Sequence, residues 1–466
     1  MKILPLLLCI GTFFTLGLCK PQQLAMDFIE ADILSEQFRE TLGDLENIAN
    51  KNGGDRAFGN PGYKASVDYI LERLKKHGDK LQTHLQNFTH IYETTKNISL
   101  TGPNGKPVHV VTLQYNTPTP LPGGITAQLV SLPVDDTTGS GCYDAQWRGS
   151  DVKGKIVLVK RGVCTISEKV RLAKKNGAVA VLIIHDDKEN DIGLASLSHQ
   201  NLGTLIPTGI VRRKEGLHWK KLLDRGDKLN ATFIVDTMSE QRESWNIISE
   251  TTEGDPNHVV MLGAHLDSIQ GSPGINDNGS GCAGILQIAN FFAKSTNYTN
   301  KARFAWWGAQ ESGLAGSLHY AKGLSEQDAD HIRFYLNMDM TGSRHANFYI
   351  HAGDEADLKG ATIIKHYTWD NGNGGKYIPF KGSSDYVPFV NLGIPTSGIF
   401  TGNSRYEHWC YHKKCDNYKS LAWRAVTTSA KAVGTTATMF ALSLEGVPPR
   451  KKIKIETLVA RSKREY

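Results

Sequence analysis

A predicted buried strand ends in residues that could bind a metal ion. Residues 259–264 are apolar, and the run stops at His265 and Asp267. A glycine-rich loop then brings up a second carboxylate, Asp277. Imidazole and carboxylate groups at a strand end are ligands typical of zinc. Because a histidine and an acid two residues apart are also common as a simple hydrogen-bonded pair, a metal site requires further ligands elsewhere in the chain.

Further candidate ligands follow the later apolar segments, in order along the chain. Gln310 and Glu311 follow one segment, Asp339 follows the next, and His412 lies in the loop after the last. In an open α/β sheet, the loops at the carboxyl ends of the strands converge on one crevice. Two histidines and three carboxylates are too many ligands for one zinc ion and suit two, which would share a water as nucleophile.

The pattern from residue 244 onward predicts the fold class. Apolar strands alternate with helices, which is typical of an α/β fold with a mostly parallel sheet covered by helices on both faces. We expect strands at residues 259–264, 303–308, 333–338, 346–350 and 396–400, and helices at residues 282–293, 317–323, 357–371 and 421–442.

The earlier part of the chain predicts a second, smaller α/β domain. Apolar residues at helical spacing predict helices over residues 24–50 and 63–77, followed by strands to about residue 115. A proline-rich crossing at residues 116–122 indicates a domain boundary. A strand, helix and strand follow, at residues 155–159, 167–176 and 178–184.

These observations divide the chain into five parts. We expect a signal peptide, the N-terminal part of the larger domain, the smaller domain, the rest of the larger domain and a basic flexible tail. Their boundaries are 1–19, 20–119, 120–235, 236–445 and 446–466.

The start of the chain indicates the secretory pathway. Lys2 precedes an apolar run over residues 3–18, with cleavage expected near residue 19. We therefore expect the protein to be secreted or delivered to the lumen of a vacuole or lysosome. No other stretch could cross a membrane, and a net charge of +6 over 466 residues is too mild to indicate nucleic-acid binding.

Four N-glycosylation sequons suit a secreted protein, at Asn87, Asn97, Asn230 and Asn297. A fifth, at Asn278, lies in the proposed metal loop and is expected to be unmodified.

Five cysteines remain after the signal peptide is removed. In an oxidising compartment we pair Cys410 with Cys415 and Cys142 with Cys164, and leave Cys282 as a buried free thiol. Spacing alone does not fix this connectivity.

Several stretches occur in an order that resembles the co-catalytic zinc aminopeptidases of the aminopeptidase Y type. The likeness runs through the catalytic region 244–445, and residues 120–235 resemble the protease-associated domain that this group carries as an insertion. The resemblance thus implies that the larger domain is catalytic and the smaller one an insertion. The stretches in the catalytic region are Gly263-Ala-His-Leu-Asp-Ser268, Asn276-Asp-Asn-Gly-Ser-Gly281, Glu311-Ser-Gly-Leu-Ala-Gly-Ser317, Asn337-Met-Asp339 and Cys410-Tyr-His412 with Cys415-Asp416.

The resemblance implies a role for each candidate residue. His265 and Asp339 would hold one zinc ion, Glu311 and His412 the other, and Asp277 would bridge them. Asp267 would hydrogen-bond the far nitrogen of His265 and fix its tautomer. Tyr411 would stabilise the oxyanion of the tetrahedral intermediate, with a packing aromatic as the alternative. The substrates would be peptides with a free N-terminus.

The chain departs from the family pattern at one position. The family has two adjacent glutamates, the first a general base and the second a ligand, whereas this chain has Gln310 followed by Glu311. A neutral amide cannot accept a proton, and general acid–base catalysis is typically worth about 10²–10⁴-fold in rate.

Three hypotheses remain open on the sequence. The first is a secreted dizinc exopeptidase, weakened by Gln310. The second is a catalytically silent zinc protein that binds peptides or partner proteins through the inserted domain. The third is a related exopeptidase or cyclase on the same scaffold.

Overall fold

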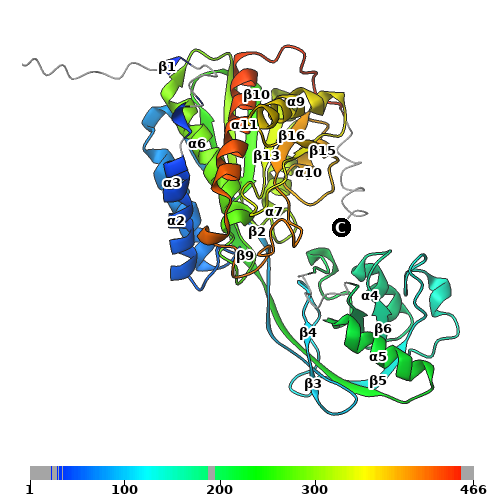
Figure 1. Ribbon diagram of the computed structural model, residues 1–466. Helices are drawn as coiled ribbons and strands as arrows, with labels where there is room; N and C mark the ends of the chain where they lie inside the picture. Colours follow the sequence, from blue (N-terminus) through cyan, green and yellow to red (C-terminus); the bar gives the residue numbers. More distant parts are fainter. Residues whose placement is uncertain (1–21, 24–28, 30, 34, 187–194, 453–466) are drawn as a thin grey trace, which may run out of the picture.

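The computed structural model describes residues 22–23, 29, 31–33, 35–186 and 195–452 (Figure 1). The expected signal peptide and residues 453–466 of the expected tail lie outside this part of the chain. Among the described residues, no helix is both long enough and apolar enough to span a bilayer.

The main sheet is parallel at its centre. β10 (Asp255–His265) pairs in parallel with β12 (Asn300–Trp307) on one side and with β13 (Ile332–Met338) on the other. β13 continues in parallel to β16 (Thr396–Phe400). Beyond β16, β14 (Tyr349–His351) is antiparallel, and β15 (Lys376–Ile378) closes that edge. The parallel centre directs the carboxyl ends of four strands to the same edge.

Helices cover both faces of this sheet, as the α/β pattern predicts. On β10, Val260 and Leu262 face one apolar cluster while Val259 and Met261 face another. The first cluster includes residues of α6 and α11, and the second includes residues of α7 and α10. The helices of this part are α6 (Gly281–Lys294), α7 (Ala315–Gly323), α8 (Glu326–His331), α9 (Glu355–Asp370), α10 (Val387–Asn391) and α11 (Trp423–Leu442).

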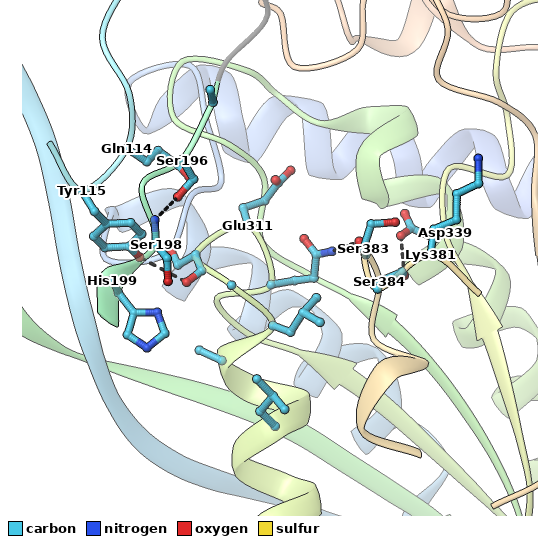
Figure 2. A pocket seen from close by; sticks show the side chains of 18 of the residues that line it. Gln114, Tyr115, Ser196, Ser198, His199, Glu311, Asp339, Lys381, Ser383 and Ser384 are labelled. Atoms are coloured by element: carbon cyan, nitrogen blue, oxygen red, sulfur yellow. Dashed lines mark hydrogen bonds between the residues drawn. The ribbon is translucent and has the colours of Figure 1, made fainter. Parts of the chain in front are cut away.

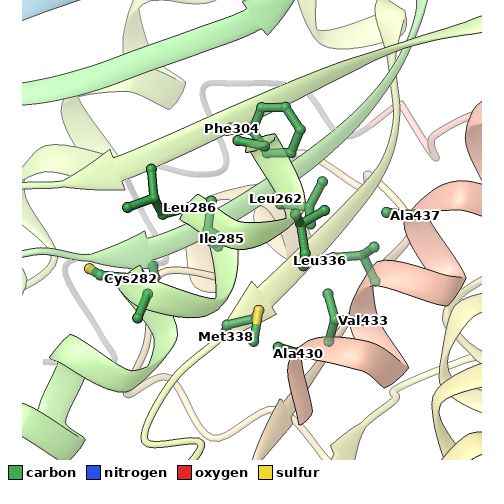
Figure 3. Close-up of a cluster of buried hydrophobic side chains, with 14 of the residues drawn as sticks. Leu262, Cys282, Ile285, Leu286, Phe304, Leu336, Met338, Ala430, Val433 and Ala437 are labelled. Carbon is green, nitrogen blue, oxygen red and sulfur yellow. The ribbon is translucent and has the colours of Figure 1, made fainter. Parts of the chain in front are cut away.

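The larger cluster fixes the helix that follows the glycine-rich loop. Figure 3 shows Ile285 of α6 and Val433 of α11 in the same cluster as Leu262 of β10. The N-terminal helices α2 (Ser35–Lys51) and α3 (Pro61–Lys75) add Phe38 and other apolar residues to the same cluster. The loop between β10 and α6 is therefore held at both ends by buried elements.

Two long strands connect this part of the molecule to the second one. β2 (Leu81–Thr101) and β9 (Asn230–Thr251) form an antiparallel ribbon, paired from Leu81 with Thr251 to Thr101 with Thr232 (Figure 1). β9 joins the main sheet through β12 at one end and pairs with β5 (Ile125–Ser131) at the other. The two sheets are thus continuous through the ribbon.

The second part is a smaller α/β unit. β5, β6 (Ile156–Lys160), β7 (Ala180–Ile184) and β8 (Thr208–Val211) pair in parallel, with β4 (Val110–Val111) antiparallel at the edge. Its helices are α4 (Ile166–Lys175) and α5 (Arg213–Asp224). The remaining short strands are β1 (Gln22–Gln23), β3 (Pro107–Val108) and β11 (Ser295–Thr296).

The expected domain limits differ from the packing. Leu100 of β2 and Leu113, which follows β4, precede residue 120, yet both lie in apolar clusters of the smaller unit. The limit at residues 235 and 236 falls inside β9, a single continuous strand. The composition change at the proline-rich crossing therefore marks a turn within the smaller unit rather than its edge.

The described start of the expected flexible tail is packed. The Arg450 side chain is 1% exposed, bonds Asp330 at 2.7 Å and also contacts Glu326. Lys451 N donates to Gly393 O at 2.9 Å. The described start of the tail is thus anchored to the larger unit through Arg450 and the backbone of Lys451.

One buried arginine ties the loop after β10 to the N-terminal helices. Arg56 is fully buried and donates to the carbonyls of Pro273 (2.9 Å), Gly274 (2.7 Å) and Leu266. Its backbone N–H donates to the Ser268 hydroxyl at 2.9 Å. The guanidinium thus satisfies carbonyls of the loop that leads to Asp277.

We expect Arg56→Met to lower the free energy of unfolding by about 3 kcal/mol, because buried carbonyls would lose their donors. Thermal and denaturant unfolding would measure the change. The control is Lys64→Met, which removes a surface pair with Asp68 and should cost less than about 1 kcal/mol. Equal losses in the two variants would contradict the role given to Arg56.

Candidate metal centre

Five sequence-predicted ligands meet at the carboxyl edge of the main sheet. His265 is the last residue of β10, and Glu311 and Asp339 lie just beyond β12 and β13. Asp277 lies in the turn Ile275–Ser280 between β10 and α6, and His412 lies in the loop after β16. The strand-end loops converge as expected, and they bring all five side chains to this edge.

The ligand atoms form two groups that share Asp277. His265 Nε2 lies 3.2 Å from Asp277 Oδ1 and 3.4 Å from Asp339 Oδ1. His412 Nε2 lies 3.2 Å from Asp277 Oδ2 and 3.2 Å from Glu311 Oε2. Each oxygen of Asp277 therefore faces a different histidine.

The chemistry of these groups fits two metal ions. Within each group the ligand atoms lie within 4.8 Å of one another. Glu311 Oε1 and Asp339 Oδ1 are buried and have no hydrogen-bond partner, although a buried carboxylate oxygen normally has one. Imidazole nitrogen and carboxylate oxygen are both zinc ligands. The residues can thus hold a cation in each group, with Asp277 as the common ligand.

The electrostatics of the cluster also favour bound cations. Burial lowers the pKa of His412, but the carboxylates of Glu311 and Asp277 outweigh it and raise that pKa to about 10. Burial likewise lowers the pKa of His265, yet Asp339 and Asp277 hold it well above its ordinary value. Burial raises the pKa of Asp277, and the two histidines more than reverse that effect. The cluster attracts positive charge, which protons or metal ions can supply.

The structure gives Asp267 a different contact from the one expected. His265 Nδ1 lies 3.0 Å from the backbone carbonyl of Asp267, whereas the carboxylate Oδ1 is 3.8 Å away. The carboxylate instead accepts the backbone N–H groups of Gln310 (3.0 Å) and Glu311 (3.2 Å). The main chain of Asp267 thus orients the imidazole, while its side chain holds the loop that carries Glu311.

Asp416 supports the ligand that both groups share. Its Oδ2 accepts the backbone N–H of Asp277 at 2.9 Å, and its Oδ1 accepts that of Asn276 at 2.9 Å. His408 Nε2 lies 3.2 Å from the same Oδ1. The sequence contained Asp416 within a family motif but offered no local signal for this contact.

Ser384 supports a second ligand, and sequence reasoning did not find it. Its hydroxyl donates to Asp339 Oδ2 at 2.6 Å and accepts from Asn337 Nδ2 at 2.9 Å. Figure 2 shows Ser384 beside Asp339 on the wall of the cavity. Since Ser384 comes from a loop far from Asp339 in the chain, no spacing pattern could have indicated the contact.

Gln310 and Tyr411 both face the space beside the ligands. The Gln310 amide Nε2 donates to Ser383 O at 3.3 Å, and among the described residues no donor engages its oxygen. The Tyr411 ring stacks on His412 with ring centroids 3.8 Å apart. Burial, followed by the charges of Asp277 and Glu311, raises the pKa of Tyr411 well above its ordinary value, so the phenol keeps its proton.

The expected cysteine pairs are present. The structure contains the disulfides Cys142–Cys164 and Cys410–Cys415, and the second closes the loop that carries Tyr411 and His412. Cys282 is a buried free thiol, as predicted.

The sequons differ in their exposure. Asn278 is fully buried, and its side chain bonds Met338 O and the N–H of Gly281, so it is inaccessible to modification. The other four sequon asparagines are exposed: Asn87, Asn97, Asn230 and Asn297.

A cavity of about 920 Å³ lies between the two α/β units, and four of the five candidate ligands line it: Asp277, Glu311, Asp339 and His412. The smaller unit contributes the segment around His199, whose ring meets His90 edge-on at 4.7 Å. On the same side, the Tyr115 hydroxyl donates to Ser312 O at 3.2 Å, directly after Glu311. In Figure 2, Tyr115 and His199 lie on the wall opposite Asp339, so a ligand would be enclosed by both units.

Comparisons with known proteins agree with this architecture. Residues 246–437 match the model of peptidase family M28, and residues 125–219 match that of the PA domain. An aminopeptidase of Pseudomonas aeruginosa is 34% identical over 442 residues, covering 87% of this chain and 81% of the relative. Aminopeptidase Y of Saccharomyces cerevisiae is 31% identical over 455 residues, covering 91% of this chain and 82% of the relative.

Solved structures show the same fold. An aminopeptidase from Aneurinibacillus sp. strain AM-1 superposes with a TM-score of 0.77 at 24% identity, covering 92% of this chain and 99% of that one. BSAP, a zinc aminopeptidase from Bacillus subtilis, gives a TM-score of 0.71 at 24% identity, covering 90% and 98%. The chain belongs to peptidase family M28, and within it to the aminopeptidases that carry an inserted PA domain.

Proposed function

We propose that this protein is a dizinc aminopeptidase that removes N-terminal residues from peptides, at a rate limited by Gln310. The observation that carries the proposal is the position of Asp277 between two ligand groups on the wall of the inter-unit cavity. His265 and Asp339 would hold one zinc ion, and Glu311 and His412 the other. Bound zinc supplies a Lewis acid for the scissile carbonyl and lowers the pKa of a coordinated water to about 7.

The side chains beside the ligands have separate tasks in this proposal. The protonated Tyr411 phenol donates a hydrogen bond to the developing oxyanion of the peptide. The free oxygen of the Gln310 amide accepts a hydrogen bond from the substrate's ammonium group. That amide cannot take up a proton, so proton transfer to the leaving amine lacks the base that the family places there.

The location proposed for the protein is extracellular, or the lumen of a vacuole or lysosome. The predicted signal peptide, the two disulfides and the four exposed sequons support it. We propose no membrane or nucleic-acid partner.

The alternative is a silent zinc-binding homologue that binds peptides or proteins, and Gln310 is the observation that favours it. A related exopeptidase or cyclase on the same scaffold would share the ligands and differ in its products. Product analysis by mass spectrometry separates these functions, because an aminopeptidase releases free amino acids and a binding protein releases nothing.

Elemental analysis should find about two zinc ions per chain, one for each ligand group. Asp277→Ala should reduce the zinc content more than Glu311→Ala or Asp339→Ala, since Asp277 belongs to both groups. Glu240→Ala, an exposed acid, is the control and should keep the full content. A wild-type protein without metal, or an Asp277 variant with full content, would remove the basis of the proposal.

Gln310→Glu should raise the rate of aminoacyl-nitroanilide cleavage at least about tenfold, because it restores a proton acceptor beside the ligands. The kcat of the zinc-loaded protein measures this effect. Gln114→Glu is the matched control, because it adds a carboxylate to the opposite wall of the same cavity and should give no such gain (Figure 2). No gain in the Gln310 variant would argue that another group already transfers the proton.

A further inference from the structure

The charges on the cavity wall are unequally distributed. Among the described residues that line the cavity, the acids are Asp277, Glu311 and Asp339, and all three belong to the ligand groups. The lysines and arginines that line it are Arg161, Lys322 and Lys381. Within the described chain, no hydrogen bond or ion pair engages the side-chain nitrogens of these three residues.

One acid beside the Arg161 segment is already engaged. Asp186, beside Gly162, pairs with Lys160 at 3.3 Å and with Arg213 at 3.6 Å. Lys322 lies close enough for its charge to act on two cavity histidines: burial lowers the pKa values of His199 and His319, and Lys322 lowers them further. Among the residues that the structure describes, this wall thus carries positive charge that no acidic side chain pairs with.

Bound metal ions would make the net charge of the cavity lining positive, because its three acids otherwise balance its three cationic side chains. Two divalent cations carry more charge than the three carboxylates that would bind them, and the adjacent Gln310 adds no negative charge. A cavity lined by charge of one sign, with low-dielectric walls, concentrates ligands of the opposite sign. The charge pattern therefore favours a substrate that brings a carboxylate in addition to its ammonium group.

The position of the cations indicates which part of the substrate they meet. Arg161 comes from the smaller unit, which contributes none of the metal ligands. A single released residue spans only about 3.5 Å of extended chain, whereas the cavity has a volume of about 920 Å³ and also has room for residues after the scissile bond. Lys322 acts on His199, which lies on the wall opposite Asp339 (Figure 2), so the residues after the cleaved one would meet Arg161 and Lys322.

We infer that the cavity selects peptides carrying a carboxylate in the residues after the scissile bond, and that Arg161 and Lys322 recognise it. This inference rests on the proposed aminopeptidase function. The carboxylate can be an acidic side chain or the free C-terminus of a short peptide. Arginine and lysine both bind carboxylates by charge-assisted hydrogen bonds.

Three peptides distinguish the two carboxylate sources: Leu-Glu-Gly amide, Leu-Gln-Gly amide and Leu-Gln-Gly with a free C-terminus. Competition measured by mass spectrometry gives the ratios of kcat/KM. We expect at least one carboxylate peptide to be preferred about fivefold or more over the neutral amide, with the preference shrinking as salt is raised.

The double variant Arg161→Gln with Lys322→Gln should reduce that preference below about twofold, since both recognising charges are gone. Arg171→Gln, an exposed cation on α4 that does not line the cavity, is the matched control and should keep the wild-type ratio. Equal kcat/KM values for all three peptides would overturn the inference and leave the aminopeptidase function standing.

If no peptide is cleaved, the aminopeptidase proposal fails separately. Equilibrium binding of the same three peptides to the zinc-loaded protein then decides the inference. Tighter binding of a carboxylate peptide, lost in the double variant, would support it, and equal affinities would overturn it.

Discussion

A concentration of buried carboxylates is the constraint on which the rest of the structure depends. Asp277, Glu311 and Asp339 lie together with two histidines, in a setting where uncompensated charge is costly. The raised pKa values of His265 and His412 express the same demand for positive charge that a metal ion meets. Neighbouring elements must hold these side chains against their mutual repulsion, and the parallel centre of the sheet does so by ending four strands at one edge.

The polar groups that hold the ligands act mainly through the backbone. Asp416 accepts the N–H of Asp277, Asp267 accepts the N–H of Glu311, and the carbonyl of Asp267 orients His265. Such contacts fix the course of a loop as well as the rotamer of one side chain. Groups that hydrogen-bond to candidate ligands in this way orient them and affect the affinity for a metal ion. A substitution at Asp416 would therefore act on both ligand groups at once.

Residue types and periodicity predicted the α/β sheet and the convergence of polar side chains at its strand ends, because strand-end loops converge in any such fold. The family resemblance then singled out five of these side chains as candidate ligands. The contacts of Ser384 with Asp339 and of Asp267 with Glu311 depend on tertiary distances that no local pattern encodes. The same holds for Arg450, whose basic neighbourhood suggested a free tail while its partners Asp330 and Glu326 lay far away in the sequence. The proline-rich crossing indicated a change along the chain, but no local pattern showed that apolar residues of β2 already pack in the smaller unit before it.

The ribbon of β2 and β9 also affects how a protein of this architecture can evolve. Thr101 and Thr232 are paired neighbours, so everything between them leaves and re-enters the ribbon at one place. The entropy cost of closing a loop grows only with the logarithm of its length, so enlarging or shortening this segment changes the cost little. A unit such as the smaller one can be acquired, exchanged or lost at this junction while the strand order of the main sheet stays the same.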